Sequence, residues 1–277
     1  MQTQHRIKGG GGLELNVLEW GKPRGRPLLL IHGWSQAYPC WEKQYQSALA
    51  DEFRIVALDL RGHGMSAAPL EQAAYTDSKL WADDIQAVIA TLSLERPVLA
   101  GWSYGGLVIS DYLKVYGDSA IAGINFVSAS VRLGASAFGT LIGNGFIEPF
   151  PRATSGSLAE SIDGIRDFIE RCFAVKLSRQ DYERVLCFNM TARPDVRASL
   201  AAREFDATEV LRKVTVPVLI TQGRKDTMVL PAMAELIAAL IHHAQMSWYD
   251  EVAHGPFMED AARFNDELAA FTRAANA

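Results

Sequence analysis

Residues 97–106 read Pro-Val-Leu-Ala-Gly-Trp-Ser-Tyr-Gly-Gly, and no other segment is as informative about the fold. An apolar run ends at Gly101 and Trp102, and a helical pattern begins at Tyr104. A serine flanked by glycines at minus two and plus two, between a strand and a helix, is typical of a strained turn that exposes the hydroxyl. A serine hydroxyl is a weak nucleophile and needs a histidine base and oxyanion donors nearby. The stretch therefore predicts Ser103 as a nucleophile.

Similar apolar runs recur along the chain. Runs this uniformly apolar favour strands that are buried on both faces. Apolar residues at helical spacing fill the intervals, so the chain predicts an α/β fold with a mostly parallel sheet flanked by helices. The runs cover residues 27–32, 54–60, 97–102, 121–127 and 217–221, with a weaker, alternating run at 245–249.

The first 20 residues predict a hairpin with strands at 4–8 and 13–20. Gly9–Gly12 lies between them and suits a turn that needs positive φ angles. The glycine run lacks the G-x-G-x-x-G spacing and leads into another strand, so it is not interpreted as a dinucleotide-binding loop.

The alternation stops between Ala129 and Lys213, where no strand-like run interrupts the helical pattern. Ser157 with Glu160, and Ser178 with Asp181, have the spacing of capping boxes at helix N-termini. We therefore predict a helical cap at 129–213, inserted into a core formed by 1–128 and 214–277.

Other motifs surround the serine in a characteristic order. His32-Gly33-Trp34 follows one strand and Asp59-Leu60-Arg61-Gly62-His63-Gly64-Met65-Ser66 follows the next, before the serine turn, an acidic loop and a C-terminal histidine. In order and spacing the chain resembles the α/β-hydrolase superfamily from end to end. The resemblance implies an oxyanion hole formed by the backbone N–H groups of Trp34 and Tyr104.

His254 is predicted to be the base by elimination among six histidines. It follows the last strand in a loop that can present an imidazole across the carboxyl edge of the sheet. The other positions are the N-terminal hairpin (His5), two loops to which the resemblance assigns structural roles (His32, His63) and a helix end (His242, His243).

Asp226 is predicted to orient the histidine, because it lies just past the strand at 217–221 and completes the order serine, acid, histidine. The competing position in the superfamily follows the preceding strand, where residues 127–130 contain no acid. Asp250 and Glu251 also precede His254, but we expect them to face solvent.

Composition excludes several other classes. The net charge of -5 and a pI near 5.7 argue against nucleic-acid or anionic-membrane partners, which require a basic surface. The sequence contains no metal-binding motif and no phosphate loop, and a serine triad needs no cofactor. Three scattered cysteines, and the absence of a signal peptide or a long apolar segment, predict a cytoplasmic protein. The oligomeric state stays open.

The predicted reaction is hydrolysis of small-molecule esters with small or medium hydrophobic acyl or aryl groups. Trp34, Phe138 and Phe146 are candidate substrate-binding residues, since acyl pockets are mostly apolar. The serine and histidine motifs resemble both microbial carboxylesterases and pimeloyl carrier-protein methyl ester esterases. Thioester, lactone and carbon-carbon bond hydrolysis, perhydrolysis, and a non-enzymatic receptor of the same fold stay open.

A carrier-protein partner would favour a basic cap. Five cap arginines could bind an acidic partner, although i to i+4 ion pairs on a solvated helix face are the favoured interpretation. These residues are Arg166, Arg171, Arg179, Arg184 and Arg197.

Overall fold

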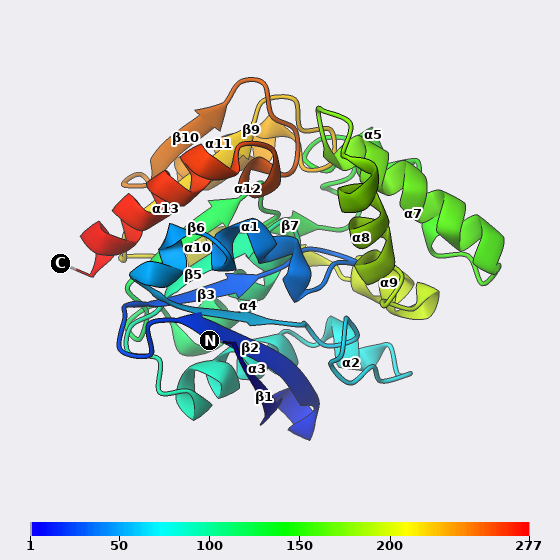
Figure 1. Ribbon diagram of the computed structural model, residues 1–277. Helices are drawn as coiled ribbons and strands as arrows, with labels where there is room; N and C mark the ends of the chain where they lie inside the picture. Colours follow the sequence, from blue (N-terminus) through cyan, green and yellow to red (C-terminus); the bar gives the residue numbers. More distant parts are fainter. Residues whose placement is uncertain (1, 277) are drawn as a thin grey trace.

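The computed structural model describes residues 2–276 and is built on an eight-stranded sheet (Figure 1). The strand order is β1-β2-β4-β3-β5-β6-β9-β10. The β1–β2 and β2–β4 pairs are antiparallel, and all other pairs in this sheet are parallel. The predicted α/β class is confirmed. The strands are β1 (Thr3–Lys8), β2 (Glu14–Gly21), β3 (Pro27–Ile31), β4 (Arg54–Leu58), β5 (Val98–Trp102), β6 (Gly123–Val127), β9 (Val218–Gly223) and β10 (Gln245–Tyr249).

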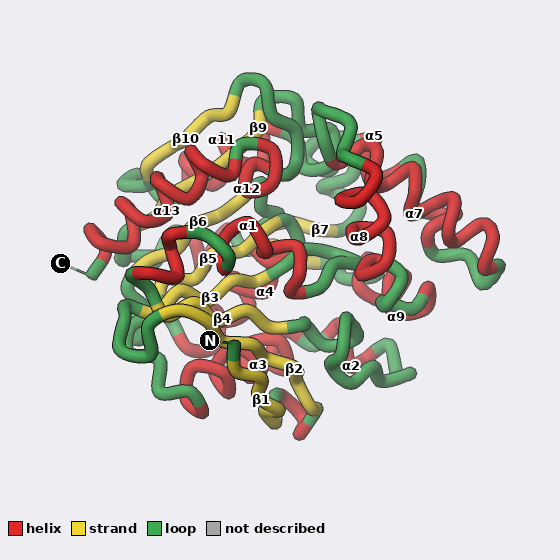
Figure 2. The backbone as a smooth tube through the Cα atoms, viewed as in Figure 1, coloured by secondary structure: helices red, strands yellow, loops and turns green. Residues whose placement is uncertain are grey.

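Helices cover both faces of this sheet, which forms the central layer in Figure 2. Side chains of a strand point alternately to opposite faces. In β3, Leu29 and Ile31 therefore join one core, whereas Leu28 and Leu30 join the other. The first core packs against α3 (Ser78–Thr91), α4 (Gly105–Tyr116) and α11 (Pro231–Leu240), and the second against α1 (Glu42–Tyr45), α12 (Pro256–Glu259) and α13 (Ala261–Ala275).

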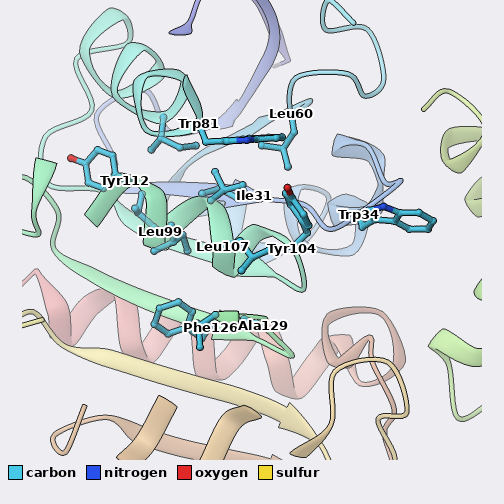
Figure 3. Close-up of a cluster of buried hydrophobic side chains, with 14 of the residues drawn as sticks. Ile31, Trp34, Leu60, Trp81, Leu99, Tyr104, Leu107, Tyr112, Phe126 and Ala129 are labelled. Atoms are coloured by element: carbon cyan, nitrogen blue, oxygen red, sulfur yellow. The ribbon is translucent and has the colours of Figure 1, made fainter. Parts of the chain in front are cut away.

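Figure 3 shows part of the first core, where Trp81 of α3 and Leu107 of α4 pack toward Leu99 of β5. Two residues of the predicted oxyanion hole, Trp34 and Tyr104, lie on the side of this cluster away from Tyr112. The hydrophobic core thus extends without a break to the carboxyl ends of the strands.

The N-terminal hairpin and its glycine turn form as predicted. β1 and β2 pair from Thr3↔Glu19 to Lys8↔Glu14, and Gly11 and Gly12 have φ angles of 67° and 74°. Such left-handed angles are readily adopted only by glycine.

The segment predicted as a cap is mostly helical, and α5, α7, α8 and α9 lie together on the right of Figure 1. It contains β7 (Arg132–Leu133), α5 (Asn144–Ile147), α6 (Phe150–Ala153), α7 (Leu158–Cys172), α8 (Arg179–Asn189), α9 (Pro194–Ala201), β8 (Phe205–Asp206) and α10 (Thr208–Leu211). The expectation of no strand here was wrong, because β7 and β8 pair antiparallel. A two-residue strand is too short to leave a pattern in the sequence.

The two predicted capping boxes have different outcomes. Ser178 accepts a hydrogen bond from the N–H of Asp181 at 3.1 Å, which caps α8 as expected. Ser157 precedes α7 without a capping hydrogen bond from its side chain. Ser155 takes over part of this role, since its Oγ donates to Glu160 at 2.6 Å and accepts from the N–H of Ser157 at 3.1 Å.

Among residues 2–276, no helix is both long enough and apolar enough to cross a bilayer.

Candidate active site

The loops after β3, β5, β9 and β10 begin at one edge of the sheet, because these strands run parallel. Ser103 lies there on the turn between β5 and α4, with a φ of 55°. Its N–H donates to Val127 O at 3.0 Å, and its carbonyl accepts from Ser130 N at 2.9 Å. These bonds hold a non-glycine residue in a conformation that costs free energy and that is common at functional sites.

The two flanking glycines are required by close packing. A Cβ at Gly101 would lie 2.8 Å from Gly105 O, and a Cβ at Gly105 would lie 2.6 Å from Ile31 O. Any side chain at either position would therefore push the turn away from the sheet.

Asp226 and His254 are in direct contact, with Asp226 Oδ2 2.7 Å from His254 Nδ1. Asp226 lies in the loop after β9, and its other oxygen accepts from the N–H groups of Met228 at 2.8 Å and Val229 at 3.0 Å. Gln222 Nε2 donates to Oδ2 at 3.1 Å. The carboxylate is thus held rigidly, with one oxygen directed at the imidazole.

The backbone of His254 is fixed by two residues that the sequence analysis did not select. The N–H of His254 donates to Cys172 O at 2.9 Å, at the end of α7, and its carbonyl accepts from Trp102 Nε1 at 2.8 Å. Trp102 directly precedes Ser103, so one residue of β5 connects the serine turn to the histidine loop. Nothing in the sequence could reveal these two partners, because both bind backbone groups of His254, and a backbone group leaves no motif in the sequence.

The predicted oxyanion donors lie beside the serine. A Cβ at Gly33 would be only 3.0 Å from Ser103 Cβ, which shows how closely the loop carrying Trp34 approaches. Within the part of the chain that the structure describes, neither the N–H of Trp34 nor that of Tyr104 donates a hydrogen bond to another protein group. Both are available to an oxygen atom of a substrate.

Two buried histidines support this loop, as the resemblance implied. His63 Nε2 accepts from the N–H of Ser35 at 3.2 Å, and His32 Nε2 accepts from Leu60 N at 3.0 Å. Burial lowers the pKa of His32 to about 4 and that of His63 to about 3. Both rings are therefore neutral near pH 7, and each can accept through one nitrogen.

A pocket lies over Ser103 and His254 and is lined by both residues. Trp34 and Phe146 line it, whereas the predicted Phe138 does not and instead stacks on Phe146 at a centroid distance of 6.5 Å. Several lining residues were not predicted, because they come from elements that are separate in the sequence. The remaining lining residues are Tyr104, Leu107, Ser130, Leu133, Ile142, Phe168, Ala201, Met228 and Val229.

The other acids and histidines that were considered for the triad lie outside the pocket over Ser103. Asp250 is paired with Arg224 at 2.7 Å and Glu251 with Lys225 at 2.5 Å, and the two acidic side chains are 77% and 85% exposed. His5 contacts Glu19 in the hairpin, and His242 and His243 are exposed just past α11. In residues 2–276, no cluster of His, Cys, Asp and Glu side chains has the arrangement of a metal site.

Four of the five cap arginines form surface ion pairs. Arg166, Arg171 and Arg179 pair within α7 or α8 with acids three or four positions away, and Arg184 pairs with Glu42 of α1. Arg197 differs, because its side chain is fully buried. The expectation that it belongs to a solvated face was wrong.

Comparison with known proteins identifies the family. The model of the alpha/beta hydrolase family matches residues 28–267. A crystal structure of a candidate aryl esterase from Burkholderia cenocepacia superposes with a TM-score of 0.93, at 32% identity, over 99% of both chains. Esterase RhEst1 from Rhodococcus sp. ECU1013 gives a TM-score of 0.91 at 34% identity, over 98% of this chain and 99% of that one.

Curated relatives have diverse names. The AB hydrolase superfamily protein YisY of Bacillus subtilis is 28% identical over 97% of this chain and 98% of its own length. Others are named non-heme chloroperoxidase, pimeloyl-[acyl-carrier protein] methyl ester esterase and bifunctional esterase/perhydrolase. The family match covers most of the chain and agrees with the sheet topology, and this protein is therefore a member of the alpha/beta hydrolase family.

Proposed function

We propose that this protein is a serine hydrolase that cleaves carboxylic esters with small or medium hydrophobic acyl or aryl groups. The observation that carries the proposal is the 2.7 Å contact between Asp226 and His254, beside a cavity that Ser103 also lines. A carboxylate that accepts from Nδ1–H leaves Nε2 unprotonated and able to take a proton from a serine hydroxyl.

In the proposed reaction, Ser103 Oγ attacks the ester carbonyl carbon as its proton moves to His254 Nε2. The N–H groups of Trp34 and Tyr104 donate to the oxyanion that forms on the carbonyl oxygen. When this intermediate collapses, the carbon–oxygen bond to the alcohol breaks and His254 returns the proton to the departing alcohol. Water then releases the acyl group from Ser103 by the same steps, with His254 again as base.

The cavity supports the proposed substrate class. Its lining combines aliphatic and aromatic side chains with the hydroxyl groups of Ser103 and Ser130. Among the described residues that line it, His254 and Tyr104 are the titratable ones. Burial raises the pKa of Tyr104 to about 12, so this residue is neutral near pH 7. A charged acyl group would lose its hydration in such a pocket without gaining a partner, whereas an apolar one would be stabilised by burial.

The experiment combines covalent labelling with turnover. Mass spectrometry after treatment with a fluorophosphonate should locate the probe on Ser103, and p-nitrophenyl esters of graded chain length should be hydrolysed. Ser103→Ala should abolish both, whereas Ser110→Ala, a change on α4 at a residue that does not line the cavity, should leave both intact. A folded protein without a label on Ser103 would refute the proposal.

Perhydrolysis is a second candidate, because relatives are named as chloroperoxidases and one as a bifunctional esterase/perhydrolase. Hydrogen peroxide would replace water in the attack on the acyl group and release a peracid. The two reactions can be compared by measuring the rate of acyl release with and without hydrogen peroxide; perhydrolysis predicts a faster rate with peroxide and formation of a peracid. The carrier-protein alternative has less support, since four of the five cap arginines are already paired with acids and Arg197 is buried.

A further inference from the structure

Arg197, on α9, is a buried cation that forms no ion pair with a carboxylate of residues 2–276. Burial lowers its pKa only to about 10, so the guanidinium is charged near pH 7. A buried charge is costly unless hydrogen bonds compensate for lost hydration. The role of this guanidinium is indicated by the segments that its hydrogen bonds connect.

Neutral acceptors surround the guanidinium. Nη1 donates to Ala153 O and Ser161 Oγ, both at 2.8 Å, and Nη2 donates to Asn189 O at 2.9 Å. Ala153 ends α6 and Asn189 ends α8. Carbonyl groups at a helix C-terminus lack partners within the helix and carry partial negative charge. The cation is thus stabilised by helix ends from the cap.

The remaining donor reaches out of the cap. Arg197 Nε donates to Ser35 Oγ at 2.9 Å, and Ser35 Oγ in turn donates to Asn189 O at 3.1 Å. Ser35 follows Trp34, the predicted oxyanion donor, and has a left-handed φ of 59°. On its other side, His63 accepts from its N–H. A strained serine is therefore held from two directions.

Helix α9 also binds Trp34 directly. The Nε1–H of Trp34 donates to the backbone carbonyl of Arg197 at 3.0 Å. Gln36 and Asn189 exchange a pair of side-chain hydrogen bonds at 3.1 and 3.3 Å. Three consecutive residues of the loop after β3 are thus tied to α8 and α9, while the loop lies against Ser103 on its other side.

We infer that Arg197 is a positioning residue for the oxyanion loop: it holds Ser35 in its strained conformation and thereby places the N–H of Trp34 over Ser103. The cap then completes the active site and is not only a cover for it. This inference rests on the proposed function for its kinetic consequences. Small displacements of groups that act in the transition state reduce kcat more than they weaken substrate binding.

The kinetic test uses Arg197→Lys, Ser35→Ala and the double variant, with kcat expressed per site titrated by the fluorophosphonate. Each single change should lower kcat for p-nitrophenyl acetate by about tenfold or more, with KM changed less than about threefold. The kcat of the double variant should be at most about twofold lower than that of the less active single variant. Both changes break the same hydrogen bond, between Arg197 Nε and Ser35 Oγ, so their effects should not add. Arg179→Lys is the matched control, since this cap arginine is exposed and paired with Glu183.

Two further measurements make the outcome unambiguous. A trifluoromethyl ketone, whose adduct with Ser103 carries an oxyanion, should lose affinity in parallel with kcat, whereas an apolar alcohol, which offers no oxyanion, should not. Hydrogen exchange in the peptide containing residues 33–37 should be faster in both single variants. This second measurement does not depend on turnover, so an inactive wild-type protein would count against the proposed function alone. Unchanged exchange, kcat within twofold of wild type in Ser35→Ala, or additive effects would overturn the inference. Ser35→Ala retains the cation and decides the matter if Arg197→Lys does not fold.

Discussion

Replacing Asp226 by asparagine should prevent His254 from acting as a base while the protein stays folded. The oxygen that accepts from the N–H groups of Met228 and Val229 must stay an oxygen, because an amide NH2 there would face two donors. The new NH2 then takes the place of Oδ2, 2.7 Å from His254 Nδ1. A protonated Nδ1 cannot donate to it, so the imidazole should adopt the tautomer with its proton on Nε2.

That tautomer cannot accept the serine proton. Loss of the acid with its geometry retained reduces kcat of a serine triad by about 10⁴, which corresponds to about 5.4 kcal/mol of transition-state stabilisation. We expect a reduction of about 10³- to 10⁴-fold here, measured as kcat for p-nitrophenyl acetate with thermal unfolding as the check on folding. The variant should still bind substrate, since Asp226 is absent from the cavity lining.

Asp250→Asn is the matched control. Asp250 lies four residues before His254, but its side chain is 77% exposed and paired with Arg224. Exposed ion pairs contribute about 0–1 kcal/mol, so both activity and stability should change little. Asp226 would not be the orienting acid if Asp250→Asn lost more activity than Asp226→Asn, or if folded Asp226→Asn kept more than a tenth of the wild-type kcat.

Three other predictions follow from local geometry. Phe146→Ala should shift the chain-length preference toward longer p-nitrophenyl esters, and Phe138→Ala should not, because Phe146 lines the cavity and Phe138 does not. Identical chain-length profiles for the two variants would contradict this placement. Gly105→Ala should lower the free energy of unfolding by about 2–4 kcal/mol, since its Cβ would lie 2.6 Å from a carbonyl oxygen of β3, whereas Gly156→Ala, with no atom within 4 Å, should be neutral in the same denaturation assay. His63 should stay neutral in NMR titrations from pH 8 to 5, given its pKa of about 3 in the folded protein. A histidine in the unfolded chain is protonated below about pH 6.5. The contribution of His63 to the free energy of unfolding is therefore complete above that pH and falls by about 2 kcal/mol by pH 5. A titration midpoint above pH 5 would contradict the burial argument.

The order and type of the core elements were predictable from the sequence. Strands buried on both faces must be apolar throughout, and this leaves runs that predict β3 to β6 and β9 within one or two residues of their observed ends. Ser103 was predictable because the turn around it requires glycine at fixed positions. Elimination among few histidines selected His254, and chain order selected Asp226, which the structure places in contact with it.

The support that distant segments give these residues is visible only in the folded protein. Trp102 and Cys172 hold the backbone of His254, and Arg197 holds the oxyanion loop, through contacts that depend on how the cap docks on the core. Charge in a sequence does not reveal burial, so Arg197 resembled its exposed neighbours in the cap. A local sequence pattern reflects the conformation that the backbone at those positions must adopt. A hydrogen bond between segments 150 positions apart requires no pattern in either, and it can be found only once the chain is folded.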